Sequence, residues 1–170
     1  MLQIKCTGKV QTFLKLKPAD MQPIAPSDTL LGDWYVNLLL IDRRKTLLFV
    51  NEKTASSFVL FGLKVRHIPN IHMVFLTSLN GFLRLQGVPA GAADAILRSY
   101  QDVSFTKTDS KQSLGIMNDL AFHYEHSIWY EHGYKYCDLD EIILRNNRIP
   151  FKCFDYGQPI TLLQGVVARL

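Results

Sequence analysis

The spacing of apolar and polar positions changes near residue 70. Before that point, short apolar runs rich in β-branched residues predict strands. They cover residues 34–41, 46–50 and 57–61, and residues 2–6 alternate as a half-buried strand does. Because the later three strands are joined by short links, we expect an antiparallel meander. Residues 18–32, which contain three prolines, form the longest predicted loop.

Beyond residue 70 the apolar residues recur at helical spacing. Helices are predicted at residues 71–87, 90–100, 110–133 and 138–145, with a short one at 7–15, a strand at 103–106, and a helix or strand at 162–168. Because strands cluster early and helices late, the order favours an α+β fold. We expect an antiparallel sheet from the N-terminal half, with one face packed against helices from the C-terminal half. No repeat or boundary interrupts the chain, so we expect a single domain over residues 1–170.

Composition restricts the class of protein. Of the 170 residues, 48% are hydrophobic and 20% are charged, which excludes a disordered chain. No uncharged apolar run approaches the ~18–20 residues of a membrane helix, and the first residues lack the apolar segment of a signal peptide. We therefore expect a cytoplasmic protein without a membrane partner. The widely spaced Cys6, Cys137 and Cys153 match neither a disulfide framework nor a zinc site, and we expect reduced, mostly buried thiols.

Charge is unevenly distributed along the chain, whose net charge is +4. Residues 1–68 hold ten Lys and Arg against five Asp and Glu, whereas residues 69–170 hold nine against ten. A basic half can steer a protein towards phosphate-rich partners, or it can serve solubility alone.

The densest basic cluster is Arg43, Arg44 and Lys45, which follows Asp42 at the predicted turn between two strands. Arginine suits phosphate because its planar guanidinium can donate two hydrogen bonds to it. Asn51 lies at the far end of the following strand and joins this candidate anion site. The alternative is an ordinary charged turn in which Asp42 neutralises an arginine.

A second candidate anion site lies where a predicted strand meets a predicted helix. Hydroxyl and lysine side chains gather there beside backbone N–H groups of a helix N-terminus, which bind anions. The candidate residues are Thr106, Lys107, Thr108, Lys111 and Ser113. The segment lacks the glycines of a nucleotide phosphate loop, and helix capping by Ser110 or Ser113 is the alternative.

Asp119, His123, His126 and Tyr130 fall on one face of the predicted helix 110–133. A carboxylate and two histidines can bind a transition metal or transfer protons. Their spacing matches no established metalloprotease motif, so a solvated helix face is the preferred interpretation and we predict no metal or cofactor. Trp129 is predicted to be a core or rim aromatic residue rather than a platform for stacking bases.

Five short motifs recur in an order that resembles a family of small, uncharacterised bacterial proteins with a domain of unknown function. They are Cys6-Thr7, Asp33-Trp34-x-x-Asn37, Ile41-x-Arg-Arg-Lys45, Phe105-Thr-Lys-Thr108 and Ser113-Leu-Gly-x-Met-Asn-Asp119. The resemblance covers residues 2–150, and this chain has Asp42 where the family pattern has Asn. It implies a common fold and transfers no activity. It also suggests that Asn37, Asn118 and Asp119 join both anion sites in one polar cleft.

Three functions remain open from the sequence. The leading hypothesis is a binding module whose basic surface contacts nucleic acid or another polyanion. The second is a protein-interaction module, such as an antitoxin-like or inhibitor-like partner of a mobile-element protein. The third, a small metal-dependent hydrolase or nuclease, ranks last because no nucleophile–base pair is recognisable in the chain, so we do not expect an enzyme.

Overall fold

A computed structural model describes residues 1–170, and its central element is a five-stranded sheet in the order β4-β3-β2-β1-β5. The strands are β1 (Leu2–Cys6), β2 (Trp34–Ile41), β3 (Arg44–Asn51), β4 (Ser57–Phe61) and β5 (Val103–Lys107). The predicted meander is confirmed, because β2, β3 and β4 pair antiparallel. The expectation of a purely antiparallel sheet is wrong, since β1 pairs in parallel with both β2 and β5.

Six α-helices complete the α+β fold. They are α1 (Gly8–Phe13), α2 (Ile71–Leu85), α3 (Ala90–Ser99), α4 (Lys111–Tyr130), α5 (Leu139–Asn146) and α6 (Pro159–Val167). The sequence-based prediction left the C-terminal element undecided, and it is a helix. None of the helices has the length and apolar character required to cross a bilayer.

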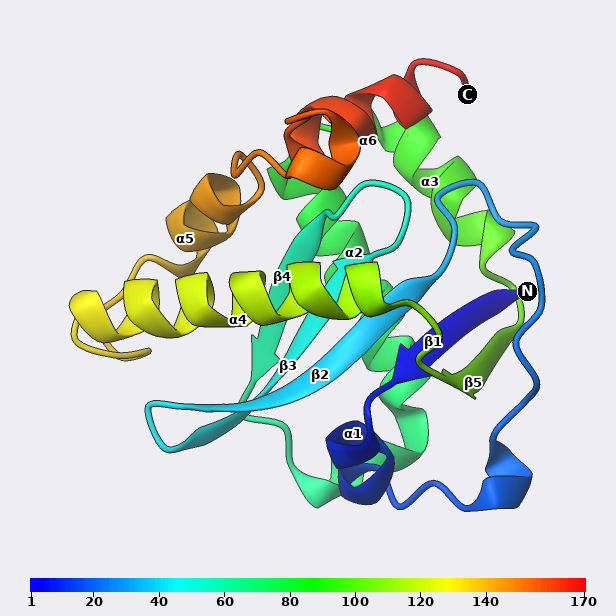
Figure 1. The fold of residues 1–170 in the computed structure, drawn as a ribbon, viewed down its shortest axis with the longest axis horizontal. Helices are drawn as coiled ribbons and strands as arrows, with labels where there is room; N and C mark the ends of the chain where they lie inside the picture. Colours follow the sequence, from blue (N-terminus) through cyan, green and yellow to red (C-terminus); the bar gives the residue numbers. More distant parts are fainter.

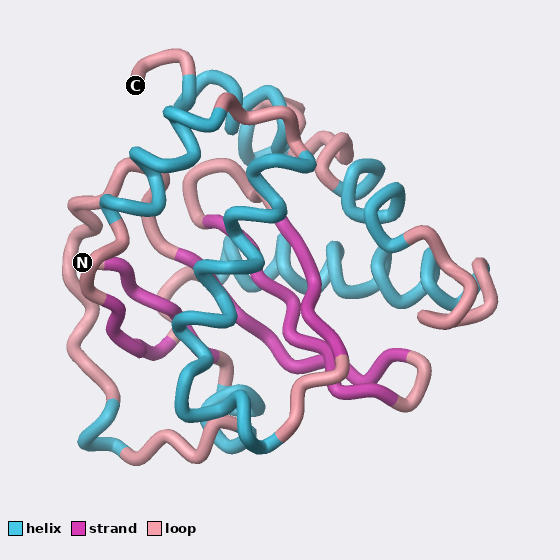
Figure 2. Tube along the Cα trace, turned by 180° about the vertical axis from the view of Figure 1, so that it is seen from behind, coloured by secondary structure: helices cyan, strands magenta, loops and turns pink.

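The sheet is covered on both faces, which corrects the expectation of a single covered face. Helix α4 crosses one face (Figure 1), and α2 crosses the other, as the reverse view shows (Figure 2). Successive side chains of a strand point to opposite faces, so a strand between two layers of helices needs apolar residues at nearly every position. The sequence of β2, Trp-Tyr-Val-Asn-Leu-Leu-Leu-Ile, meets this requirement.

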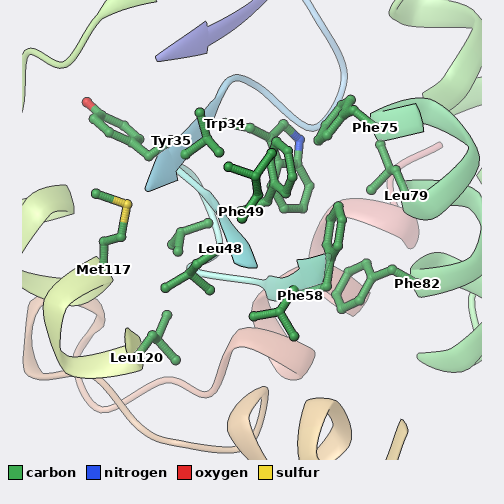
Figure 3. Packing of buried hydrophobic residues seen from close by; sticks show 14 of the residues in the cluster. Trp34, Tyr35, Leu48, Phe49, Phe58, Phe75, Leu79, Phe82, Met117 and Leu120 are labelled. Atoms are coloured by element: carbon green, nitrogen blue, oxygen red, sulfur yellow. The ribbon is translucent and has the colours of Figure 1, made fainter. Parts of the chain in front are cut away.

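Aromatic side chains dominate the layer between the sheet and α2. Trp34 of β2 and Phe58 of β4 are almost fully buried, and their rings lie 5.5 Å apart at an edge-to-face angle of 62°. Phe75 and Phe82 of α2 pack against both of them (Figure 3). Such pairs contribute ~0.5–1.5 kcal/mol each beyond the burial of their area. This cluster therefore fixes α2 on the sheet.

The opposite layer holds α4 against the sheet through its buried side chains. Figure 3 shows Met117 and Leu120 of α4 beside Tyr35 and Leu48 of the sheet. The spacing of three residues places both helix residues on one face. Helix α4 thus starts near β5, crosses the sheet, and ends on the side of the β2–β3 turn (Figure 1).

Both outer edges of the sheet are protected. Residues of the proline-containing loop bind the outer edge of β5, where the Gln22 N–H donates to the carbonyl of Phe105 at 2.8 Å. At β4, the amide side chain of Asn147 accepts from the Ser57 N–H at 2.9 Å and donates to its carbonyl at 2.7 Å. These contacts occupy backbone groups that an exposed edge strand offers to other chains.

Candidate functional site

The turn between β2 and β3 presents the basic cluster of the sequence. Ile41 pairs with Arg44, so Asp42 and Arg43 alone form the turn, and both have positive φ angles of 48° and 59°. This is the backbone of the two-residue turns that match the twist of a hairpin. Arg43 is therefore held at the tip.

Asp42 forms no ion pair with an arginine of the turn, contrary to one of the two alternatives. Its carboxylate accepts a hydrogen bond from the backbone N–H of Tyr134 at 3.0 Å, just beyond the end of α4. Arg43, Arg44 and Lys45 are exposed, and none of them forms an ion pair. The turn thus carries three cations without an ion-pair partner, and its net charge with Asp42 is 3 − 1 = +2.

Two of these cations are oriented by aromatic rings of the sheet and of α1. The Arg44 guanidinium lies 5.7 Å from the ring centre of Phe61, and the Lys45 ammonium lies 5.0 Å from that of Phe13. A cation over a ring face is attracted by ~0.5–1 kcal/mol at an exposed site. The contacts restrict the side chains while leaving their charges accessible.

Exposed rings line the half of α4 that lies beside this turn. We call Phe122, His126, Trp129 and Tyr130 the aromatic row; the exposed fractions of its Phe, Trp and Tyr are 67%, 74% and 72%. The His126 ring centre lies 6.1 Å from that of Phe122 and 6.3 Å from those of Trp129 and Tyr130. The prediction that Trp129 belongs to the core or its rim is wrong, because most of its surface faces solvent.

An open hollow of about 1160 Å³ joins the aromatic row to the hairpin. Its walls are Leu40, Ile41 and Asp42 on the sheet side and the aromatic row with its neighbours on α4. Leu40 is itself 70% exposed. The hollow ends at Asp42, which immediately precedes Arg43, and none of the three cations lines it.

The strand–helix junction lies elsewhere, so the two predicted anion sites do not form one cleft. Cys6 pairs with both Lys107 and Val36, and Arg43 lies seven residues beyond Val36. At ~3.3 Å per residue and ~4.8 Å between strands, the turn is more than about 20 Å from Lys107. Figure 1 shows the turn and β5 at opposite sides of the sheet. The one-cleft hypothesis is therefore wrong.

Several predicted site residues have structural partners instead. Asn51 is 1% exposed, and its amide bonds the carbonyls of Leu31 and Asp33. Thr106 is fully buried, and the Ser110 hydroxyl accepts from the Ser113 N–H as the cap of α4. The capping alternative is thus confirmed, while Lys107 and Lys111 are exposed and Thr108 is partly exposed.

The remaining polar candidates are dispersed. Asn37 accepts a hydrogen bond from the Thr7 hydroxyl at 3.0 Å on the sheet. Asn118 and Asp119 are exposed on α4. Asp119, His123 and His126 do not come together, and no group of three potential ligands is placed to hold a metal ion.

A buried polar cluster that no local sequence pattern indicates surrounds Lys5 on the α4 face of the sheet. The Lys5 ammonium donates to Glu52 at 2.7 Å and to Asp109 at 3.1 Å, and the Tyr35 hydroxyl also donates to Asp109. A polar hollow of about 570 Å³ adjoins the cluster, and Asp33, Ser110 and Ser113 also line it. Alternation alone assigned Lys5 to solvent, although its side chain is only 6% exposed.

The cluster shifts the pKa values of its members. Burial alone would lower the pKa of Lys5, but hydrogen bonds to Glu52 and Asp109 raise it above the ordinary lysine range. Burial alone would raise the pKa of Asp109, but hydrogen bonds from Tyr35 and Lys5 outweigh burial and lower it. Burial and the bond to Asp109 raise the pKa of Tyr35 to about 12. Lys5 is therefore a charged anchor at neutral pH and unsuited to act as a nucleophile.

The three thiols are free but differ in exposure. Only Cys6 is buried, Cys137 is partly exposed and Cys153 is exposed, so the expectation of mostly buried thiols is wrong.

The fold and its surfaces define an α+β domain that combines a basic hairpin with an exposed aromatic helix face. A protein-family model described as a domain of unknown function, DUF6933, matches residues 3–162, and the chain belongs to this family. The expected membership of an uncharacterised family is thus confirmed. No curated protein matches the chain.

Proposed function

We propose that the protein binds nucleic acid or another polyanion through the β2–β3 turn. The observation that carries this proposal is the charge of the turn, where Arg43, Arg44 and Lys45 are exposed and none of them forms an ion pair. The backbone of a rigid turn loses little conformational entropy when its side chains meet phosphate. Guanidinium groups add bidentate hydrogen bonds to its oxygens.

The physics of polyanion binding gives this proposal a quantitative signature. Each phosphate neutralised by a side chain releases condensed counterions, so the logarithm of the binding constant falls linearly with the logarithm of salt concentration. The slope is ~0.7 per contact for single strands. Loss of three contacts should therefore flatten the slope by about 2.

The test is fluorescence anisotropy with labelled RNA and DNA, single-stranded and duplex, and with heparin, over a series of salt concentrations. The combined variant Arg43→Ala, Arg44→Ala, Lys45→Ala should bind more weakly and with a flatter slope. The matched control replaces Arg84, Arg98 and Arg148, which are exposed, form no ion pair and lie outside the hairpin. It removes the same charge. Equal slopes in the two triple variants would refute the assignment.

A second candidate function is a protein-interaction module. The exposed rings of Phe122, Trp129 and Tyr130 favour it, since large exposed apolar surfaces often bind proteins. An antitoxin-like or inhibitor-like role would use this face. Absence of any binding to polyanions at low salt would favour this candidate over the first, because hairpin charges would then have no ligand.

A further inference from the structure

The aromatic row is not required to complete the core. Helix α4 already buries a full stripe that includes Met117, Leu120, Tyr124 and Ile128, all at most 1% exposed. The row projects from the solvent side of the same helix. A helix that is apolar on its exposed face as well as its buried one indicates a ligand for the exposed face.

The neighbourhood of the row narrows the chemistry of that ligand. One end of the hollow is Asp42, beside which the turn carries Arg43, Arg44 and Lys45 outside the lining, and the long wall is a series of planar rings. A ligand that satisfies both must carry anionic groups and flat aromatic groups in alternation. Single-stranded nucleic acid has this pattern, whereas a duplex hides its base faces and heparin has none.

We propose that the aromatic row stacks unpaired bases, so that the protein prefers single-stranded nucleic acid to a duplex. The inference rests on the proposed function and names the substrate class of the same surface. Phosphates contact Arg43, Arg44 and Lys45, and bases lie against the rings of Phe122 and Trp129.

The length of the aromatic row suits a short segment of single-stranded nucleic acid. Phe122 and Tyr130 are eight residues apart on α4, which is about 12 Å along the helix axis. Stacked bases are spaced by ~3.4 Å, so the row has room for about three of them. The carboxylates of Asp42 and Glu125 both line the same hollow and repel phosphate. The sugar–phosphate backbone of the nucleic acid is therefore directed away from the aromatic row, towards the β2–β3 turn.

The two tryptophans provide a direct optical test. Trp34 is fully buried, whereas Trp129 is 74% exposed. Stacking of a base on Trp129 should quench its emission and protect it from acrylamide. We would titrate the protein with an oligouridylate of about 12 nucleotides, within the ~4–16 nucleotides of known single-strand sites. Heparin should bind the turn without quenching.

Affinity measurements on variants complete the test. Trp129→Ala should weaken oligouridylate binding about 5- to 150-fold, the equivalent of ~1–3 kcal/mol for each base stacked. Heparin affinity should stay unchanged. The matched control is Tyr156→Ala, an aromatic residue that is 66% exposed and outside the row. It should bind like the wild type.

Failure of this inference is distinguishable from failure of the proposed function. Salt-dependent binding of oligouridylate that needs the turn but neither quenches Trp129 nor weakens in Trp129→Ala would overturn base stacking alone. Equal loss of heparin and oligouridylate in that variant would also overturn it. Sedimentation showing a dimer that Trp129→Ala dissociates would assign the row to a second copy of the chain. No binding of any polyanion would overturn both proposals.

Discussion

Replacement of Lys5 with methionine should lower the free energy of unfolding by about 2–3 kcal/mol. Loss of one partner from a buried ion pair typically costs ~3–5 kcal/mol, because the remaining charge is left unpaired. Here the side chains of Glu52 and Asp109 are 29% and 33% exposed, so water can hydrate them after the ammonium is removed. The expected loss of unfolding free energy is therefore smaller than the ~3–5 kcal/mol of a fully buried pair. It corresponds to a melting temperature lower by about 4–12 °C for a chain of this size.

Urea denaturation of four proteins isolates the interaction between Lys5 and Asp109. They are the wild type, Lys5→Met, Asp109→Asn and the double variant. The double variant should lose less stability than the two single variants together, by ~1–3 kcal/mol, because each single change already removes the same Lys5–Asp109 interaction. Lys9→Met, at an exposed position on α1, is the control for losing one lysine. A neutral Lys5→Met would refute the reasoning, since it would mean that desolvation cancels the attraction.

The same cluster predicts the shape of the stability–pH curve. The pKa of Asp109 is lowered in the folded state, so its contribution is present above the unfolded pKa and is lost as pH falls through the folded one. The pKa values of Lys5 and Tyr35 are raised, and their contributions decline as pH rises above the unfolded values. Burial raises the pKa of Asp33, which opposes part of the acid loss. Lys5→Met should flatten both the acid and the alkaline limb of the stability–pH curve. An unchanged curve would contradict this account.

Two further predictions concern the sheet edge and the thiols. Asn147→Ala should destabilise the fold by ~1–3 kcal/mol, because the buried N–H of Ser57 loses its partner while the Ser57 carbonyl keeps only the Tyr124 hydroxyl; a loss below 1 kcal/mol in urea denaturation would contradict this role, with Asn118→Ala on the exposed face as control. In a thiol-reagent assay Cys153 should react fast and Cys6 only after unfolding, since Cys6 is buried and burial raises its pKa to about 12. Reaction of Cys6 at the rate of Cys153 in the native protein would refute the assignment.

The helices and strands were predicted well because apolar spacing and turn residues depend only on neighbours in the chain. Apolar runs rich in β-branched residues and the charged turn located β2 and β3, and helical spacing located α2 and α4 with small errors at their ends. The apolar run of β2 also indicated burial on both faces. Such a run does not identify which helix covers which face, and the expectation of one covered face follows from the order of strands before helices.

The sites were less predictable because their contacts are distant in sequence. Lys5 reaches Glu52 and Asp109 over separations of 47 and 104 residues. Neither partner has a local motif that indicates it. The parallel placement of β1 between β2 and β5 creates these contacts, and no turn chemistry specifies that placement. The basic turn was found because its three cations are consecutive.

The exposure of Trp129 could not be inferred from helical spacing alone. Its helix carries apolar residues on two faces, and the sequence does not say which of them meets the sheet. The buried stripe of α4 repeats at the spacing of a core helix. The aromatic row repeats at the same spacing on another face of the helix. Only the packed sheet distinguishes the two.

Contacts at both ends of α4 hold the aromatic row open to solvent. Near its start, Asp109 is bound by Lys5 and Tyr35. Beyond its other end, Gly133 has a φ of +92°, and a Cβ there would lie 2.6 Å from the carboxylate of Asp42. Only glycine allows this approach, which lets Asp42 accept the Tyr134 N–H and fixes the basic turn to the helix. Because these anchors and the buried stripe are independent of the row, changes to its rings should alter binding while leaving stability within about 0.5 kcal/mol of the wild type.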